Sequence, residues 1–304
     1  MGVILILGRA EDLCCRLVSE RLTQDGQEVL FLPEDRLLPQ MALAWTPADG
    51  AGRVRFEGRE VSFSEMDGVL YRFYGIPLAA EEFGTEDGRY VCSEWNALWM
   101  AWLNMPREAL PCPIVNRLRP DLWYKTHLSA AALVALVPDL PFARPRTLVT
   151  TSADAARAFR RRVAGPVTYT ALSGSAPYPL CKEEEFEKLL ALNGALPLHL
   201  TEEVAGRRCE AFVIGGRVTL VGPDGALCGP PSPALADRCA RVGTRLDLAL
   251  FQLSLVAGVG DEWYCLSLDR MPQLYACGPD AQAEIAQRLA ALLTSPQGQE
   301  GGHA

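Results

Sequence analysis

Apolar positions along the first residues follow the spacing of alternating strands and helices. Residues 2–7 form an apolar, β-branched run that ends at Gly8, as a buried strand does. Apolar residues over 11–23 then recur at helical spacing, with Gly26 as the expected stop. Residues 27–32 supply a second apolar run. This pattern predicts a strand–helix–strand start, which is typical of an α/β domain.

Alternating and helical patterns continue through the rest of the chain. The predicted strands lie at residues 54–56, 60–63, 66–72, 114–116, 166–170, 198–204, 208–214, 217–221 and 261–268. The predicted helices lie at residues 93–103, 127–137, 153–163, 235–256 and 281–293. Gly215 and Gly216 separate two alternating runs and predict a tight hairpin turn.

Three tryptophans mark one face of the helix predicted at residues 93–103. Trp95, Trp99 and Trp102 are spaced by four and three residues, which places them along the same side. Such a stripe is either a binding platform or part of the core, and core packing is its more common use. We therefore expect these side chains to be buried.

The composition is that of an ordinary globular protein. The chain has 304 residues, of which 49% are hydrophobic and 22% charged, a balance that excludes a disordered main body. The net charge of -8 argues against a nucleic-acid partner, because phosphate contacts need clustered Lys and Arg. The basic run at residues 160–162 is expected to be a solvated helix face.

Targeting and redox motifs are absent from the sequence. No segment approaches the roughly 20 consecutive apolar residues that span a bilayer, and no secretory signal is recognisable at residues 3–7. We therefore expect a cytoplasmic protein with no membrane partner. Ten cysteines are scattered without a CxxC pair, which predicts reduced core thiols and no metal or redox site.

Residues 112–170 carry the strongest resemblance to a known family. The chain has here, in order, CPIVNRLRPDLWYK, a helix, PFARPRTLVTT and PVTYT. This order resembles the front of an ATP-grasp domain. The chain resembles the glutathione synthetase and ribosomal-protein glutamate ligase type, which joins a carboxylate to an amine through an acyl-phosphate made from ATP. The resemblance implies an α/β fold that becomes α+β towards the C-terminus. Its expected parts are a Rossmann-like pre-grasp domain over 1–112, a lid-like central subdomain over 113–192, a C-terminal ATP-grasp subdomain over 193–295 and a disordered tail over 296–304.

The resemblance implies two lysines on the nucleotide phosphates, and the sequence has only the first. Thr170 stands at the second position, where a hydroxyl can bond a phosphate oxygen but cannot neutralise it. The main chain of the following loop can cradle an anion, and two glutamates beyond it are the nearest candidates for adenine and ribose. The alternatives are that Lys125 is an exposed lysine at a helix start and that residues 173–175 form an ordinary loop. The implied nucleotide-binding residues are Lys125, Thr170, Ser173, Gly174, Ser175, Glu202 and Glu203.

The magnesium site that the resemblance implies is altered. The family places an acidic residue and then Glu-x-Asn around the cation, whereas Gln252, Ser267 and Asp269 fill these positions here. Compared with that pattern, Gln252 and Ser267 are neutral where the family has acidic ligands, and Asp269 is acidic where the family has a neutral one. A single carboxylate is poor support for a dinuclear magnesium site, although Asp247 can be a shifted ligand.

Two arginines are candidates for orienting an acidic substrate. Arg72 ends a predicted strand and Arg217 begins another, and a guanidinium can hold a carboxylate by two parallel hydrogen bonds. An intramolecular ion pair is an equal alternative for Arg72.

Two hypotheses from different classes follow. In the first, the chain is a degenerate ATP-grasp protein, a pseudoenzyme that uses its cleft to bind a peptide, metabolite or protein partner; the lost lysine and carboxylates favour it. In the second, it is an ATP- and Mg²⁺-dependent carboxylate–amine ligase with a small-molecule or peptide substrate. Another Lys or Arg within reach of Thr170, such as Arg144, Arg146 or Lys182, would favour the ligase, and a cleft plugged by Trp or Tyr would exclude it. The oligomeric state stays open, with a homodimer among the alternatives.

Overall fold

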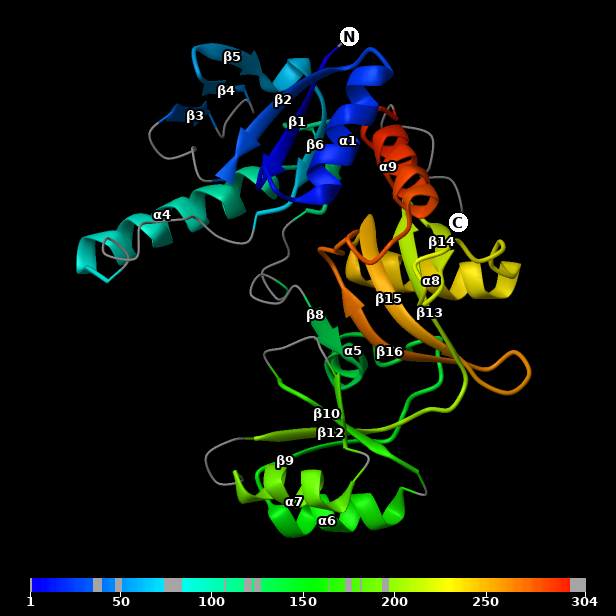
Figure 1. The fold of residues 1–304 in the computed structure, drawn as a ribbon. Coiled ribbons are helices and arrows are strands. Elements are labelled where there is room, and N and C mark those ends of the chain that lie inside the picture. Colours follow the sequence, from blue (N-terminus) through cyan, green and yellow to red (C-terminus); the bar gives the residue numbers. More distant parts are fainter. Residues whose placement is uncertain are drawn as a thin grey trace.

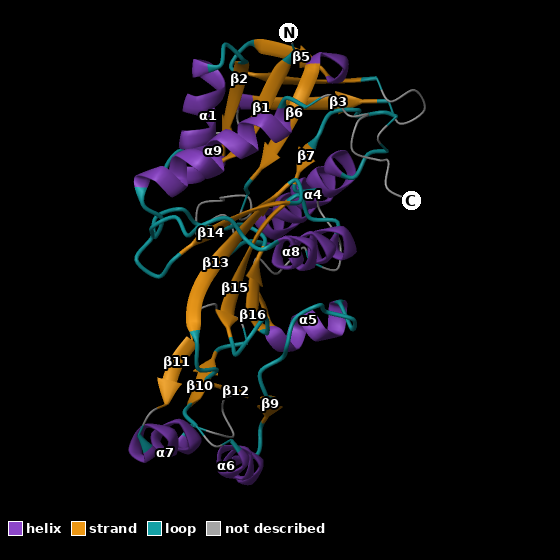
Figure 2. Ribbon diagram, turned by 90° about the vertical axis from the view of Figure 1, so that its right-hand side faces the viewer, coloured by secondary structure: helices purple, strands orange, loops and turns teal. Residues whose placement is uncertain are grey.

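The described residues form four sheets in the computed structural model (Figure 1). The structure describes residues 2–34, 40–46, 51–73, 84–106, 108–117, 122, 127–163, 165–172, 177–180, 182–192 and 197–295. Along these residues the N-terminal sheet, a central sheet and a smaller sheet follow one another from one end of the molecule to the other (Figures 1 and 2). The predicted tail at 296–304 lies outside the described residues.

The N-terminal sheet is parallel, with the strand order β2-β1-β6-β7. Its elements are β1 (Val3–Gly8), α1 (Leu13–Gln24), β2 (Glu28–Pro33), β6 (Met66–Tyr71), α4 (Glu86–Leu103) and β7 (Ile114–Val115). The predicted strand–helix–strand start is confirmed. Helix α1 begins at Leu13 because the Asp12 carboxylate accepts hydrogen bonds from the Cys14 and Cys15 amides.

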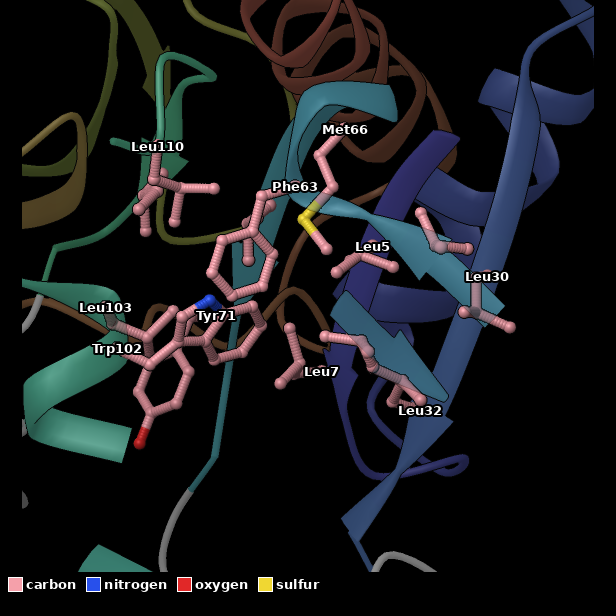
Figure 3. Close-up of a cluster of buried hydrophobic side chains, with 14 of the residues drawn as sticks. Leu5, Leu7, Leu30, Leu32, Phe63, Met66, Tyr71, Trp102, Leu103 and Leu110 are labelled. Carbon is pink, nitrogen blue, oxygen red and sulfur yellow. The ribbon is translucent and has the colours of Figure 1, made fainter. Parts of the chain in front are cut away.

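Alternate residues of β1 bury different layers. Ile4 and Ile6 pack with α1 and with α9 (Pro279–Leu293), whereas Leu5 and Leu7 pack on the other face with α4 (Figure 3). Trp99 and Trp102 are buried in that second layer as expected, whereas Trp95 is only partly buried against it. The N-terminal sheet is therefore covered on both faces, as parallel sheets are.

A small antiparallel sheet, β3-β4-β5, covers part of the same layer. Its strands are β3 (Met41–Trp45), β4 (Gly52–Phe56) and β5 (Arg59–Ser62), and the short helix η2 (Phe63–Glu65) follows. The hairpin predicted around Gly58 is confirmed by the pairing of β4 with β5. Strand β3 was not predicted.

A second antiparallel sheet, here called the lid sheet, has the order β11-β10-β12-β9. It consists of β9 (Thr147–Thr150), β10 (Val167–Thr170), β11 (Pro177–Leu180) and β12 (Leu198–Glu202), backed by α6 (Ala153–Arg162) and α7 (Glu183–Ala191). Ser152 caps α6, because its hydroxyl accepts a hydrogen bond from the Ala155 amide.

The central sheet, here called the floor sheet, is antiparallel with the order β14-β13-β15-β16-β8. Its elements are β8 (His127–Ser129), α5 (Ala130–Leu136), β13 (Arg207–Ile214), β14 (Arg217–Val221), α8 (Pro233–Leu246), β15 (Leu250–Ala257) and β16 (Trp263–Asp269). Helices α5 and α8 pack on one face through the third core cluster. Gly215 and Gly216 form the predicted hairpin turn, both with positive φ.

Two predicted helices were wrong in part. The helix expected over 235–256 ends at Leu246, where Asp247 adopts a left-handed conformation, and residues 250–257 form β15. Gln252 and Ser254 alternate with buried leucines, which is a strand pattern. The prediction of one long helix did not take this alternation into account. The helix expected over 127–137 begins at Ala130, because the preceding residues pair with β16 as β8.

The sheets group some residues differently from the expected domain ranges. Strand β7 lies in the N-terminal sheet, β8 in the floor sheet and β12 in the lid sheet. The nine cysteines among the described residues are free thiols, most of them buried. No helix in the described part of the chain has the length and apolar character needed to cross a membrane.

Candidate functional site

A cavity of about 440 Å³ lies between the lid sheet and the floor sheet. Residues from β10, β12, β13, β15, β16 and β8 line it, together with the connection from β12 to β13. Six of the residues proposed from the sequence face this cavity. They are Thr170, Glu202, Glu203, Gln252, Ser267 and Asp269.

The lid wall of the cavity is polar, and Glu202 is its charged residue among the described ones. Strand alternation turns Leu198 and Leu200 towards α6 and α7 and leaves His199 and Thr201 on the cavity side, beside Thr168 and Thr170 of β10. Thr170, the residue at the expected second lysine position, therefore does lie in the cavity wall. It brings a hydroxyl and no positive charge to this wall.

His199 is the unusual member of this wall. The residue is only 2% exposed, and neither ring nitrogen has a hydrogen-bond partner among the described residues. Burial lowers the pKa of the imidazole, which favours its neutral form. His199 was not predicted as a site residue from the sequence, although its position in an alternating strand beside Thr201 was a usable signal.

Two glutamates and an arginine surround the connection from β12 to β13. Glu202 accepts a hydrogen bond of 2.7 Å from the Arg146 amide. Glu203 accepts one of 3.2 Å from the Arg208 guanidinium, which also lines the cavity. Of the other basic residues considered from the sequence, Arg144, Arg146 and Lys182 are not among those that line it. The lining residues that the structure describes include neither Trp nor Tyr, so no such side chain plugs the cavity.

The floor of the cavity is formed by two rows of residues that run across the sheet. Register pairs Ser254 with Glu210 and Ser267, and Ser267 with Ser129. In the second row, Gln252 pairs with Asp269, and Asp269 with His127. The opposite face of the same strands packs on α5 and α8. The three residues proposed for magnesium are thus brought together on one face of the sheet.

Glu210 is a second carboxylate on this floor, and the sequence analysis did not propose it. Its Oε2 accepts hydrogen bonds of 2.8 Å from Gln252 Nε2 and of 2.8 Å from Ser254 Oγ. Burial raises the pKa of Glu210, and the nearby Asp269 carboxylate raises it further. An acidic residue in the otherwise apolar run of β13 was the available signal in the sequence.

Asp269 is half-buried beside His127. Its Oδ1 accepts a hydrogen bond of 2.8 Å from the Met271 amide, and burial raises the pKa of the carboxyl. Burial lowers the pKa of His127, which Asp269 partly opposes. Within the described residues no three His, Cys, Asp or Glu side chains are grouped as a metal site.

The two arginines proposed for substrate binding lie elsewhere. Arg72 is 1% exposed, and its Nε donates a hydrogen bond of 2.9 Å to Asp12, so the ion-pair alternative describes it. Its guanidinium also donates to the Pro272 carbonyl oxygen. Arg217 lines a different cavity, between the β13–β14 turn and α9, together with Arg21 and Arg288. Neither arginine is among the residues that line the cavity between the lid and floor sheets.

Four proposed nucleotide-binding residues cannot be placed in this site. Lys125, Ser173, Gly174 and Ser175 lie outside the described residues.

Comparison with known proteins identifies the fold of this chain. No family model and no curated protein matches the chain. Among solved structures, the macrocyclase MdnC from Microcystis aeruginosa MRC, bound with precursor peptide MdnA, has a TM-score of 0.75 and 13% identity; the match covers 96% of this chain and 99% of MdnC. The ATP-grasp ligase PsnB, complexed with precursor peptide PsnA2 and AMPPNP, has a TM-score of 0.75 and 19% identity, with coverage of 95% and 97%. The chain has an ATP-grasp fold.

A third solved structure extends the likeness. A RiPP-associated ATP-grasp ligase from Chryseobacterium gregarium, in complex with ADP and a leader and core peptide, has a TM-score of 0.73 and 15% identity over 96% of both chains. PsnB has also been solved with a minimal precursor, Mg and ADP. The ATP-grasp fold of this chain is thus similar along nearly its whole length to ligases that were solved with precursor peptides.

Proposed function

We propose that this chain is an ATP-dependent peptide ligase with an altered nucleotide and magnesium site. The observation that carries the proposal is the open, polar cavity between the lid and floor sheets, which brings Thr170, Glu202, Gln252 and Asp269 together. A peptide is the preferred substrate class because ligases of similar fold were solved with precursor peptides. The reaction joins a carboxylate of the substrate to an amine.

The floor residues present are compatible with one magnesium ion. Asp269 offers a carboxylate, Ser267 offers a hydroxyl and Gln252 offers its amide oxygen. The amide nitrogen of Gln252 already donates a hydrogen bond to Glu210. Mg²⁺ in such sites is bound by one or two carboxylates and otherwise by phosphates and water. When bound, ATP would supply the phosphoryl group that activates a carboxylate, and Mg²⁺ would offset the charge of the phosphate oxygens. Glu202 and Glu203 are the residues that we assign to the nucleoside.

The described cavity walls offer little positive charge to the phosphates of ATP. Arg208 is the cation among the described lining residues, and it is engaged with Glu203. Neutralisation by the protein then depends on Lys125. We therefore expect MgATP to bind more weakly than in an ATP-grasp ligase with both lysines.

A second candidate function is peptide capture without catalysis. The absence of a cation on the described part of the lid wall around Thr170 and the carboxylates of the cavity favour it, because both disfavour a polyphosphate. The two candidates share the peptide and differ in whether nucleotide chemistry is retained.

Calorimetry of MgATP and MgADP binding separates the candidates, with Lys125→Ala as the control. Binding that the variant loses supports the ligase, and peptide-dependent ADP release must then follow. Absence of binding at millimolar nucleotide contradicts the ligase and leaves peptide capture. Thr170→Lys should strengthen nucleotide binding by about tenfold or more if the second lysine position is equivalent, whereas Thr168→Lys should not.

A further inference from the structure

The described walls of the cavity between the lid and floor sheets carry more negative than positive charge. Arg208 is their cationic residue and lies 3.2 Å from Glu203. His199 adds no charge to the lid wall at neutral pH, because burial lowers its pKa. The carboxylates in these walls are Glu202, Glu203, Glu210 and Asp269. A cavity with this balance concentrates cations over anions.

Glu210 is held in the geometry of a cation-binding carboxylate. Gln252 and Ser254 both donate to Oε2 and fix the side chain against the floor. No described residue donates a hydrogen bond to Oε1, and the side chain faces the cavity. An ammonium group offers up to three donors, and its hydrogen bond to a carboxylate is among the stronger ones in proteins.

His199, on the opposite wall, is an independent sign of a ligand. It is 98% buried, faces the same cavity, and has two ring nitrogens without a partner among the described residues. Buried polar atoms in proteins are normally hydrogen-bonded. A neutral imidazole has one donor and one acceptor, which is the complement of an amide group.

We propose that the cavity holds a lysine side chain of the peptide, with its ammonium group on Glu210, and that His199 hydrogen-bonds a main-chain amide of the same peptide. The inference rests on the proposed function, because it assumes that a peptide enters this cavity. It goes further by naming the substrate class, a peptide with a primary ammonium group. Neither residue is needed for the assignments of magnesium to Asp269 or of the nucleoside to Glu202 and Glu203.

The test uses the full chain and short acetylated peptides that differ at one residue. The peptide Gly-Ala-Lys-Ala-Gly is compared with versions that carry acetyl-lysine or glutamate in place of lysine, and binding is followed by calorimetry without nucleotide. We expect the lysine peptide to bind at least about tenfold more tightly than the acetyl-lysine peptide, since a charged hydrogen bond is lost. Glu210→Gln should abolish this preference, and Glu184→Gln, an exposed change on α7, should leave it intact.

His199 is tested by two variants. His199→Leu should weaken all the peptides by a similar factor and leave the lysine preference unchanged, whereas His199→Gln, which keeps a donor and an acceptor, should restore part of the affinity. Equal binding of the lysine and acetyl-lysine peptides would overturn the inference while leaving a peptide-binding cleft. Failure of every peptide to bind at millimolar concentration would overturn both the inference and the peptide substrate of the proposed function.

Discussion

Arg72 and Asp12 form an ion pair that is almost completely enclosed by the protein. The two side chains are 1% and 4% exposed and meet at 2.9 Å. Asp12 also caps α1, and Arg72 also donates to Pro272, so the pair joins the end of β6 to the start of α1 and to the segment after β16. Arg72 therefore has a structural role at the boundary between the N-terminal sheet and the floor sheet.

Asp12→Ala should lower the free energy of unfolding by about 3–5 kcal/mol, because it leaves a buried guanidinium without its carboxylate and removes the α1 cap. Chemical denaturation measures the loss. Asp237→Ala is the matched control, since it breaks an exposed ion pair with Arg241 and should cost much less. Similar losses in the two variants would contradict the role given to the buried pair.

His199→Leu should stabilise the protein in the absence of ligand. The substitution replaces two unpartnered buried nitrogens with an apolar side chain, and an unsatisfied buried polar group costs about 1–3 kcal/mol. Urea unfolding of the free protein should show a gain of that order. A loss of stability would mean that the imidazole already has a hydrogen-bond partner in solution.

Glu210→Gln should stabilise the protein at neutral pH and lose this advantage in acid. Burial raises the pKa of Glu210, so the folded state holds the proton more tightly than the unfolded chain. Stability then falls as the pH rises from the unfolded pKa, about 4.3, to the folded pKa. Denaturation midpoints across this range should diverge for wild type and Glu210→Gln as the pH rises. A constant difference would contradict the raised pKa.

At the scale of elements, the boundary between α8 and β15 decides where Gln252 points. Asp247 ends the helix with φ of +50°, and the next turn reverses the chain into a strand that pairs with β13 and β16. The reversal converts a helical position into a strand position. Gln252 and Ser254 consequently face the cavity, while the leucines between and after them pack on α8.

Asp247→Gly should raise the free energy of unfolding by a few tenths to about 1 kcal/mol. Glycine adopts the left-handed conformation without the penalty of a Cβ atom, and the greater freedom of its unfolded chain offsets part of the gain. Asp237→Gly, inside α8, is the control and should lower stability by a few tenths of a kcal/mol, because glycine is a poorer helix former and the ion pair with Arg241 is lost. Thermal unfolding should show a gain of stability for Asp247→Gly and a loss for Asp237→Gly. A loss in Asp247→Gly would contradict the proposed helix end.

At the scale of the whole molecule, α9 and Asn116 join the N-terminal sheet to the floor sheet. Helix α9 packs on β1 and α1 on one side and on Phe212 and Ile214 of the floor on the other. Asn116, directly after β7, accepts hydrogen bonds from the Ala249 and Leu250 amides and donates to the Leu250 carbonyl oxygen. These contacts fix one end of the floor, and its other end remains open to the cavity.

Gly68→Ala should loosen the docking of α9. A Cβ atom at Gly68 would lie 2.5 Å from the Leu293 carbonyl oxygen, so the end of the helix must shift at a cost of about 1–3 kcal/mol. Hydrogen exchange should show faster exchange at the C-terminal amides of α9. Gly229→Ala is the control, because no heavy atom lies within 4 Å of its added Cβ. Unchanged exchange in Gly68→Ala would contradict the close approach.

The sequence by itself determined most elements of this protein and the order in which they form an ATP-grasp fold. Local patterns suffice for this, because the alternating runs of β13 and β14, the Ser152 cap and the apolar face of α9 each express burial along a short segment. The sequence also identified Gln252, Ser267 and Asp269 as one group, although from a resemblance and with Gln252 on a helix.

Only the tertiary structure decided which polar residues share the cavity. Glu210 and His199 lie on different sheets, and each has an ordinary place in an alternating strand, so no local pattern distinguishes them. Arg72 likewise has the same local sequence whether it meets a substrate or Asp12, a partner 60 positions away. Contacts between residues so distant along the chain depend on how the sheets pack, and that packing reflects the burial of the whole core.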